Sequence, residues 1–350
     1  MKIVFIHSLN NYTGSPNILS IVIKELIRCG YTAEIVTSRS EGFLSRIENA
    51  GYRYTCYRWT ECMGRTILLL LLSQLGVFFR CFLGSQKHIY YINTIVPFGA
   101  VIACWLTRKR YIIHVHENMQ QHKSLYILLK QIYRFCNRKT IFVSDYLAKQ
   151  AINCRSGIVI PNVLSNEFIQ IANKCERKGE NILMLSSCRR YKGIYVFAEL
   201  ARMLPAYSFE LVLSANKEKV EQFKAEIGVI PNLTVYTYQT NVHPFFQRAK
   251  LLLQLSQPSE CVETFGLTIL EGMAYGIPTI VPSVGGPIEL VDNGKNGYTL
   301  DPTNLSLIQR RIEKLMNENE LYEKFARNAK RKSMDYTQAR IIKAIENYIK

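Results

Sequence analysis

The chain has 350 residues, of which 48% are hydrophobic, so it can form two buried cores and is not an extended disordered chain. Its formal net charge is +17, with 20 Lys+Arg against 7 Asp+Glu in residues 1–165 and 24 against 20 in residues 166–350. The basic first half favours an anionic partner, namely nucleic acid, a phosphorylated small molecule or an anionic membrane surface, with a solvated basic surface as the alternative.

The chain begins with a short predicted strand at Ile3–Ile6. The apolar run is too short for a signal-peptide core, so we expect a cytoplasmic protein. A helical pattern follows from Pro16 to Gly30, and a second strand is predicted at Ala33–Thr37. A strand, a helix and a strand within ~35 residues form a βαβ unit, which implies parallel pairing. Further strands of this half are predicted at His88–Ile92, Arg110–Val115 and Thr140–Val143.

The segment Thr66–Leu83 is strongly apolar but is interrupted by three polar residues. It falls short of the ~20 apolar residues of an uninterrupted membrane span. We therefore interpret it as a buried core helix. The alternative is a helix that lies in a membrane interface, with Arg58, Arg65 and Arg80 reaching lipid phosphates.

The second half repeats the alternation of strands and helices. Strands are predicted at Asn181–Leu185, Phe209–Leu213, Leu233–Tyr236, Leu251–Leu255, Ile277–Pro282 and Tyr298–Leu300. We expect an α/β fold of two Rossmann-like, doubly wound lobes that face each other across a cleft. The predicted domains are residues 1–165 and residues 166–330. Residues 331–350 are expected to form a helix that packs back toward the first lobe.

The most informative motif runs from Glu263 to Pro278, with the sequence ETFGLTILEGMAYGIP. A helix is predicted to begin at Phe265–Gly266, and its first N–H groups offer a natural seat for phosphate. Gly266 has no Cβ, so a phosphate could approach the backbone closely. Glu263 precedes the helix and Glu271 lies about two turns along it, so the carboxylates are roughly 8–12 Å apart. Such a pair is suited to binding two separated hydroxyl groups.

This motif resembles the donor site of the retaining glycosyltransferases of family GT4, which have the GT-B fold, and the order of the other segments is also similar. The resemblance implies that Glu271 binds the ribose hydroxyls of a nucleotide and that Glu263 contacts the donor sugar. It also implies that the backbone of Phe265, Gly266 and Leu267 meets the sugar or the phosphate. The alternative for Glu271 is an ordinary exposed residue of a helix.

Cationic side chains occur in the loop Ser186–Gly193, directly after a predicted strand. Cations at this position can clamp a diphosphate and stabilise charge on a leaving group. Lys192 matches the GT4 pattern. Its arginine partner is either Arg189 or Arg190, because the two residues are adjacent. We predict that Arg189 takes part in catalysis and that Arg190 contributes to donor binding.

Three polar residues, His114, His116 and Glu117, lie at the end of a predicted strand. His116 matches a histidine that GT4 enzymes often carry near the donor sugar, and we predict a catalytic role for it. His114 is equally consistent with a core position, and Glu117 could position the acceptor. Zinc binding by the two histidines is unattractive because the sequence offers no evident third ligand.

Two further loops complete the predicted donor site. Gly14 and Ser15 lie in a loop after the first strand that resembles the glycine-bearing loop near the donor phosphates in GT4 enzymes. Gln239, within Tyr238–Asn241, is predicted to contribute to the pocket for the nucleotide base.

The chain contains four Asp residues and none forms the Asp-x-Asp pair with which other sugar transferases hold a metal ion on the diphosphate. We therefore expect no cofactor and no metal requirement, with cationic side chains and a helix dipole carrying the leaving-group charge. The resemblance also implies transfer with retention at the anomeric carbon. We prefer front-face attack assisted by the leaving phosphate, because no residue is an obvious covalent nucleophile.

The expected partners are a UDP- or GDP-linked sugar and a lipid-linked or oligosaccharide acceptor, in the biosynthesis of a bacterial surface polysaccharide such as O-antigen or capsule. The expected location is the inner face of the cell membrane, with peripheral attachment to its anionic surface. Two alternatives remain: another GT-B enzyme, such as a nucleotide-sugar epimerase or a phosphorylase, and a basic nucleic-acid-binding protein. The sequence lacks the aromatic and basic pattern of a known nucleic-acid motif, so we expect no nucleic-acid partner.

Overall fold

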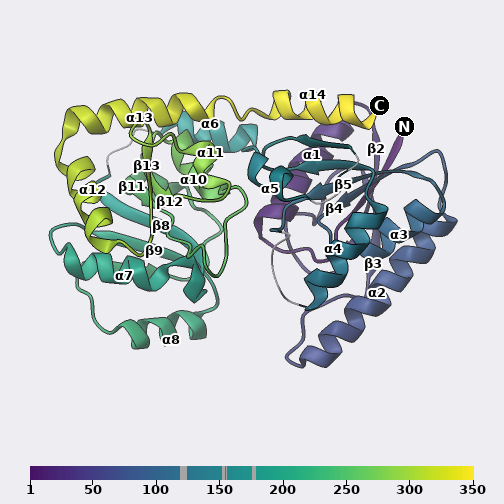
Figure 1. The fold of residues 1–350 in the computed structure, drawn as a ribbon, viewed down its shortest axis with the longest axis horizontal. Helices are drawn as coiled ribbons and strands as arrows, with labels where there is room; N and C mark the ends of the chain where they lie inside the picture. Colours follow the sequence, from purple (N-terminus) through teal and green to yellow (C-terminus); the bar gives the residue numbers. More distant parts are fainter. Residues whose placement is uncertain (119–123, 152–153, 155, 176–178) are drawn as a thin grey trace. The chain divides into compact units, whose positions relative to one another are not determined.

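The computed structural model describes all residues except 119–123, 152–153, 155 and 176–178. The described residues form two compact units: unit 1 is Met1–Asn162 with Ala339–Lys350, and unit 2 is Val163–Gln338. Each unit contains one parallel sheet with helices packed against it (Figure 1). The α/β class of two doubly wound domains that the sequence predicts is therefore confirmed.

The described sheet of unit 1 has seven strands in the order β3-β2-β1-β4-β5-β6-β7, and all neighbouring pairs are parallel. Its strands are β1 (Lys2–Ile6), β2 (Thr32–Ser38), β3 (Ala50–Thr55), β4 (Ile89–Asn93), β5 (Arg110–Val115), β6 (Lys139–Phe142) and β7 (Ser156–Val159). Its helices are α1 (Gly14–Arg28), α2 (Met63–Leu83), α3 (Phe98–Leu106), α4 (Ser124–Cys136), α5 (Asp145–Gln150) and α14 (Gln338–Ile349).

The central strands of this sheet are buried on both faces, which is why they read as continuous apolar runs in the sequence. The two strands that the sequence analysis did not predict, β3 and β7, lie at the two edges of the sheet. Strand β3 (AGYRYT) is largely exposed and carries charged and polar residues, and β7 has only four residues. Neither has the apolar pattern from which a strand can be predicted.

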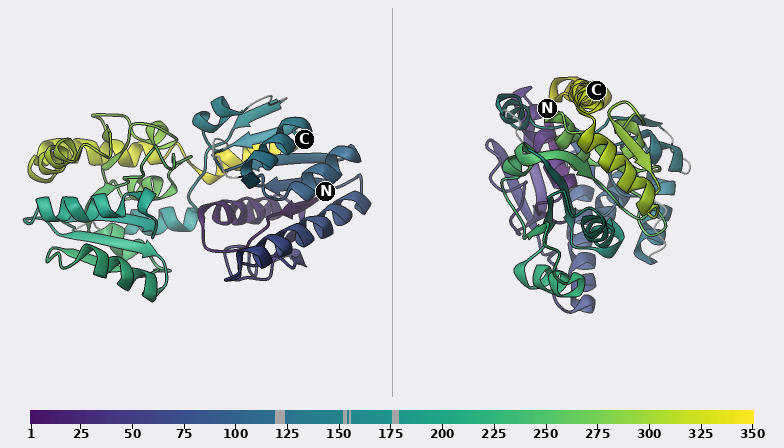
Figure 2. Two further views of the ribbon diagram at one scale, coloured as in Figure 1. Left: turned by 60° about the horizontal axis from the view of Figure 1, so that its bottom comes forward. Right: turned by 90° about the vertical axis from the view of Figure 1, so that its left-hand side faces the viewer.

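Helix α14, the last helix of the chain, packs against unit 1. The Arg110 guanidinium donates to the carbonyl oxygens of Ile349 (2.9 Å) and Lys350 (3.4 Å), and Lys139 Nζ donates to Tyr348 O (2.6 Å). Arg110 also approaches the sulfur of Met1, so the two chain ends lie side by side (Figure 2). This helix begins at Gln338, later than the expected residue 331, because the preceding residues belong to another helix.

Unit 2 has a six-stranded parallel sheet in the order β10-β9-β8-β11-β12-β13. Its strands are β8 (Asn181–Ser187), β9 (Phe209–Ser214), β10 (Leu233–Tyr236), β11 (Ala249–Leu253), β12 (Thr279–Pro282) and β13 (Gly297–Leu300). Its helices are α6 (Asn166–Lys174), η1 (Arg190–Lys192, a single 3-10 turn), α7 (Ile194–Met203), α8 (Lys217–Ile227), α9 (His243–Arg248), α10 (Leu267–Ala274), α11 (Pro287–Leu290), α12 (Leu305–Asn317) and α13 (Asn319–Ser333).

The interpretation of Thr66–Leu83 as a buried core helix is wrong. The segment is the larger part of α2, and a whole face of this helix is exposed, including Leu68, Leu72 and Leu75, which are 49–56% exposed. The prediction failed because apolar composition alone cannot show which side of a helix packs against the sheet.

Candidate functional site

In each sheet the direction of the strand order reverses once, between β1 and β4 in unit 1 and between β8 and β11 in unit 2. Open α/β sheets bind ligands outside the carboxyl ends of the strands at such a point, because the loops on its two sides diverge. Polar residues gather at both points, one group in each unit.

The loops that follow β8 and β11 are fixed to each other. Gly193 ends the first loop with a φ of 80°, and a Cβ at this position would lie 2.1 Å from the carbonyl oxygen of Leu255. Glycine is therefore required both for the left-handed backbone and for the close approach. The amide of Gln257 also donates to the carbonyl oxygen of Tyr191 (2.7 Å). These contacts hold the cationic loop beside the end of β11.

The loop that follows β12 holds the start of the Glu263 motif. The amide of Gly286 donates to the carbonyl oxygen of Glu263 (2.9 Å), and a Cβ on Gly286 would lie 2.2 Å from the carbonyl oxygen of Thr264. The loops after β8, β11 and β12 thus form one connected layer at the carboxyl edge of the sheet.

Lys192 and Glu263 meet within this layer. Lys192 Nζ donates to Glu263 Oε2 over 2.6 Å, and the two side chains are 22% and 25% exposed. Burial acts to lower the pKa of Lys192, but the Glu263 carboxylate more than offsets this, so the pKa is raised. The ammonium group therefore stays charged throughout the physiological pH range, at the carboxyl end of β8.

The two adjacent arginines differ in their contacts. The guanidinium of Arg190 lies over the ring of Tyr195, 5.2 Å from its centroid, in a cation–π contact. Arg189 has extended backbone angles and an exposed side chain, and its guanidinium forms no ion pair or hydrogen bond with the described residues. Of the two, Arg189 has the guanidinium with fewer contacts to the described residues.

Glu271 lies on α10, and its carboxylate forms no hydrogen bond or ion pair with the part of the chain that the structure describes. Burial raises the pKa of Glu271 to about 8, since no neighbouring cation offsets the loss of water. A partly buried carboxyl group without a protein partner is unfavourable for folding. Such an arrangement is typical of a group that binds a ligand.

The remaining predicted donor residues of unit 2 are Phe265, Gly266 and Leu267, at the start of α10, and Gln239, in a separate loop. The Phe265 side chain is buried, and its ring lies 6.0 Å from that of Tyr336, so its backbone is the part that could meet a ligand. Gly266 and Leu267 begin α10. Gln239 follows β10 at the edge of the sheet and donates to the carbonyl oxygen of Thr237 (3.3 Å).

In unit 1, Asn93 connects the polar residues at the switch point. It is the last residue of β4 and is fully buried. Its Nδ2 donates to His7 Nδ1 (3.1 Å) and to the carbonyl oxygen of Ser15 (3.3 Å), and its Oδ1 accepts from His116 Nε2 (3.0 Å). Because Oδ1 can only accept, His116 Nε2 carries a proton. One side chain therefore joins the ends of β1, β4 and β5 and the start of α1.

The histidines of this cluster are neutral. Burial lowers the pKa of His7 to about 4 and that of His114 to about 3, and it holds the pKa of His116 well below its usual range. His114 accepts or donates a 2.8 Å hydrogen bond with Tyr91 and lies behind His116, with the two ring centroids 4.2 Å apart. Burial also raises the pKa of Glu117 to about 7, although backbone N–H groups oppose the shift.

Four residues that the sequence analysis singled out belong to this cluster, namely Ser15, His114, His116 and Glu117, and three residues of it were missed. Ser15 joins it through its carbonyl oxygen, whereas Gly14 is the exposed first residue of α1. His7, Asn93 and Thr94 were not predicted, and Thr94 has a φ of 74°, which is strained for a β-branched residue. The available signal was that His7 and Asn93 are polar residues at the carboxyl ends of two neighbouring central strands.

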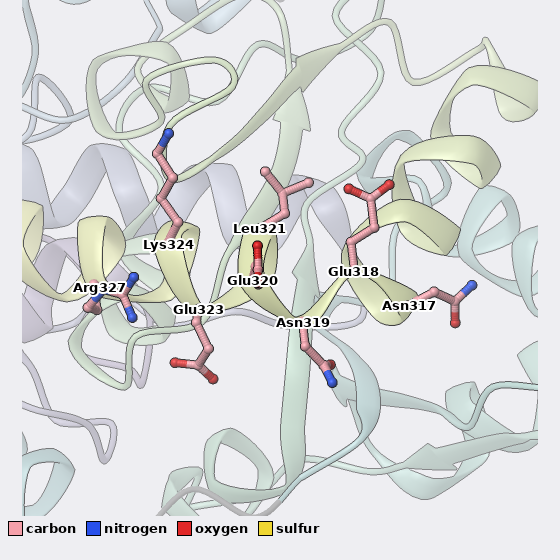
Figure 3. A pocket seen from close by; sticks show the side chains of 8 residues that line it. All are labelled: Asn317, Glu318, Asn319, Glu320, Leu321, Glu323, Lys324 and Arg327. Atoms are coloured by element: carbon pink, nitrogen blue, oxygen red, sulfur yellow. The ribbon is translucent and has the colours of Figure 1, made fainter.

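A large hollow of about 1070 Å³ lies elsewhere, along the junction of α12 and α13. Its eight lining residues lie between Asn317 and Arg327, and Figure 3 shows their side chains projecting in different directions from the helices. Since these polar groups do not converge on one point, this hollow lacks the character of a binding site.

Comparison with known proteins agrees with these observations. The family model described as "Glycosyl transferases group 1" matches residues 166–332. The putative glycosyltransferase EpsD of Bacillus subtilis is 26% identical over 146 residues, which are 41% of this chain and 37% of EpsD. N-acetyl-alpha-D-glucosaminyl L-malate synthase of Bacillus anthracis is 33% identical over 176 residues, which are 49% and 45% of the two chains. The matched stretches thus span less than half the length of these relatives.

Solved structures are similar over nearly the whole chain. Anabaena HepE, in complex with UDP and glucose, has a TM-score of 0.80 at 18% identity, with 99% of this chain and 98% of HepE covered. WaaG, a glycosyltransferase involved in lipopolysaccharide biosynthesis, has a TM-score of 0.74 at 13% identity, with 100% and 99% covered. At these identities the likeness establishes the fold, and the predicted GT-B fold is confirmed.

Proposed function

We propose that this chain transfers a sugar from a nucleotide-sugar donor to a saccharide acceptor, since its residues 166–332 match the family model of the group 1 glycosyl transferases. The observation that carries the proposal is the layer of loops in unit 2, in which the Lys192–Glu263 ion pair lies at the end of β8 and the Glu271 carboxylate has no hydrogen-bond or ion-pair partner among the described residues. HepE, which has the same fold, has been crystallised with UDP and with UDP-glucose, which supports a UDP- or GDP-linked donor here.

In the proposed complex the Glu271 carboxylate accepts hydrogen bonds from the ribose hydroxyls, and the charge of the diphosphate is balanced by Lys192, Arg189 and the N-terminus of α10. Arg190 is assigned a structural role, because its guanidinium is engaged with Tyr195. Glu263 orients the donor sugar, and Gln239 contributes to the base pocket. These cationic groups make a metal ion unnecessary in this proposal.

We propose that the configuration at the anomeric carbon is retained, as the GT4 resemblance implies. The acceptor oxygen forms its bond to this carbon on the face from which the phosphate leaves, while the bond from the carbon to the phosphate oxygen breaks. The acceptor proton passes to the leaving phosphate, so a nucleoside diphosphate and a glycosidic bond are the products. His116 is held neutral and donates its Nε2–H to Asn93, so its Nδ1 accepts a hydrogen bond from a sugar hydroxyl in this scheme.

The proposed acceptor is a lipid-linked saccharide used in surface-polysaccharide biosynthesis, and the proposed location is the cytoplasmic face of the cell membrane. The structural similarity to WaaG, which takes part in lipopolysaccharide biosynthesis, supports this role. The excess of basic residues in the first half of the chain supports an anionic membrane as partner.

Thermal unfolding with UDP, GDP and ADP and their sugar conjugates, with and without EDTA, tests the donor site. We expect stabilisation by one nucleotide that EDTA does not change and that is weaker in Glu271→Ala. The absence of any shift in folded protein would overturn the proposal. Conversion of the sugar nucleotide without an acceptor would instead identify an epimerase, the main alternative.

The role of Asn93 is tested by Asn93→Leu, for which we expect kcat to fall about 10–100-fold because His116 and the first turn of α1 lose their common partner. Asn137→Leu is the matched control, since Asn137 is equally buried in unit 1 and caps the end of α4. Equal turnover per folded molecule in the two variants would contradict the role. The ¹⁵N shifts of His116 should report loss of the Nε2–H tautomer in Asn93→Leu alone.

A further inference from the structure

Helix α2 presents large apolar side chains to the outside as well as to the sheet. Its inward face combines the buried apolar residues Leu70, Val77 and Cys81 with the buried polar residues Thr66, Ser73 and Gln74. Its exposed face consists mainly of large apolar side chains, each at least 43% exposed: Met63, Ile67, Leu68, Leu71, Leu72, Leu75, Phe79, Phe82 and Leu83. A surface helix in water normally has charged and polar residues on its exposed face. An apolar face of this size marks an interaction site.

The helix is nevertheless fixed to unit 1. Gln74 Oε1 accepts from the amide of Gly99 (3.1 Å), and Gln74 Nε2 donates to Ser8 Oγ (3.3 Å). At its other end, Lys109 Nζ donates to the carbonyl oxygen of Phe82 (2.6 Å). Among the described helices, α2 has the length and composition to cross a membrane, yet only 33% of its apolar 18-residue stretch is buried. Because these contacts hold α2 along the unit, its apolar face is placed to enter a bilayer in plane.

The neighbouring helices extend this surface. Helix α3 packs against both α2 and α4, and the three lie on one side of the unit 1 sheet (Figure 1). They connect strands that step in the same direction across the sheet, so right-handed crossovers place them on the same face. The exposed apolar residues that they add are Trp105, Leu106, Leu125, Ile127, Leu128 and Phe135. We call this set together with the exposed face of α2 the apolar surface.

The charge around the apolar surface favours a lipid bilayer over a second copy of the chain. Residues 56–138 contain 11 Lys+Arg against 2 Asp+Glu. Arg58, Arg65, Lys87 and Arg108 are exposed within this range. In a dimer through this face, two sets of cations would repel each other, whereas anionic headgroups complement them. The chain's two tryptophans, Trp59 and Trp105, are also exposed here, and tryptophan is enriched at membrane interfaces.

We propose that the apolar surface inserts into the acyl region of an anionic leaflet, with α2 lying in the membrane plane and its flanking arginines at the headgroups. Insertion to about 5–10 Å is typical of such helices. This inference deepens the proposed membrane location and does not depend on the transferase activity, because the surface is separate from the donor residues of unit 2.

Vesicle flotation together with tryptophan emission tests the proposal, using vesicles of phosphatidylcholine with and without phosphatidylglycerol. We expect the full chain to float with the anionic vesicles, with a blue shift in emission that persists in part at high salt. A variant with Leu68→Gln, Leu72→Gln and Leu75→Gln should bind at least about tenfold more weakly, because it loses apolar area that insertion would bury. Arg58→Glu with Arg65→Glu should weaken binding to anionic vesicles specifically.

The matched control carries Val229→Gln, Ile288→Gln and Met334→Gln, which replace three exposed apolar residues of unit 2. It should float like the unmodified chain. Flotation of the α2 variant at the same level, or no flotation of the unmodified chain, would overturn the proposal. A dimer in solution that the α2 variant dissociates would assign the surface to a second copy. The nucleotide-induced thermal shift should be the same in both variants, so failure of this inference and of the proposed function can be told apart.

Discussion

Replacing Lys192 with methionine is expected to lower kcat by about 10²–10³-fold, the range found when a group that stabilises developing negative charge is removed. Methionine keeps much of the length of the side chain but removes its charge. The ammonium group lies 2.6 Å from Glu263 Oε2, and its pKa is raised, so it is charged at every pH used for assays. In the proposed reaction this charge stabilises the leaving diphosphate as the bond between the anomeric carbon of the donor sugar and the phosphate oxygen breaks.

Lys250→Met is the control for this experiment. Lys250 is also a buried lysine of unit 2 that pairs with a glutamate, since its Nζ lies 2.9 Å from Glu180 Oε2. Lys192→Met should lose stability, because it leaves the largely buried Glu263 carboxylate without its partner, whereas Glu180 is 75% exposed and stays hydrated in Lys250→Met. Only Lys192→Met should lose kcat, as measured by single-turnover kinetics at saturating donor. Equal kcat in the two variants, corrected for the folded fraction, would show that Lys192 serves only the fold.

The donor residues of unit 2 could be predicted because they lie in short, contiguous stretches of sequence. Lys192 and Glu263 are in two loops whose places after β8 and before α10 follow from the strand pattern, and the structure brings them into contact. The sequence could not choose between Arg189 and Arg190. The structure separates their roles through Tyr195, one turn further on, because the guanidinium of Arg190 lies over its ring.

The polar cluster of unit 1 was predicted less completely, because its members come from strands that are far apart in sequence. Asn93 and His7 are separated by 86 residues and meet only because β1 and β4 are neighbours at the switch point. Strand order is not contained in the local pattern of either strand. The same limitation applies to α2: its apolar composition predicts a helix, but its exposed face is determined by the contacts of Gln74.

Glu271→Gln is expected to abolish the pH dependence of nucleotide binding that this group causes and to weaken the binding about 10–100-fold, because the neutral amide keeps one acceptor oxygen and replaces the other with an NH2 donor. The pKa of Glu271 is raised to about 8, so most of the group is protonated at pH 7. The ionised form accepts hydrogen bonds more strongly, so binding favours release of this proton. Nucleotide affinity should therefore rise between pH 7 and pH 8.5 in the unmodified chain and not in the variant.

Isothermal titration calorimetry in two buffers of different ionisation enthalpy measures the released proton directly. Titration of the nucleotide phosphates is common to both proteins and cancels in the comparison. Glu320→Gln, an exposed glutamate of α13, is the control and should behave like the unmodified chain. Equal proton release in Glu271→Gln and in the unmodified chain would exclude Glu271 as the titrating group and with it the proposed ribose contact.

Although Glu271→Gln should weaken nucleotide binding, it should raise the stability of the nucleotide-free protein at high pH. A carboxyl group whose pKa is raised from 4.5 to about 8 on folding holds its proton in the folded state. It therefore lowers stability progressively as the pH rises from 4.5 through 8. Glu271→Gln lacks this cost, so its Tm without nucleotide should exceed that of the unmodified chain by about 10 °C at pH 9, with little difference at pH 4.5. A higher Tm of Glu271→Gln at pH 9, together with weaker nucleotide binding, would show that Glu271 serves ligand binding at a cost to the stability of the nucleotide-free protein. A lower Tm of Glu271→Gln at pH 9 would mean that the carboxylate stabilises the fold.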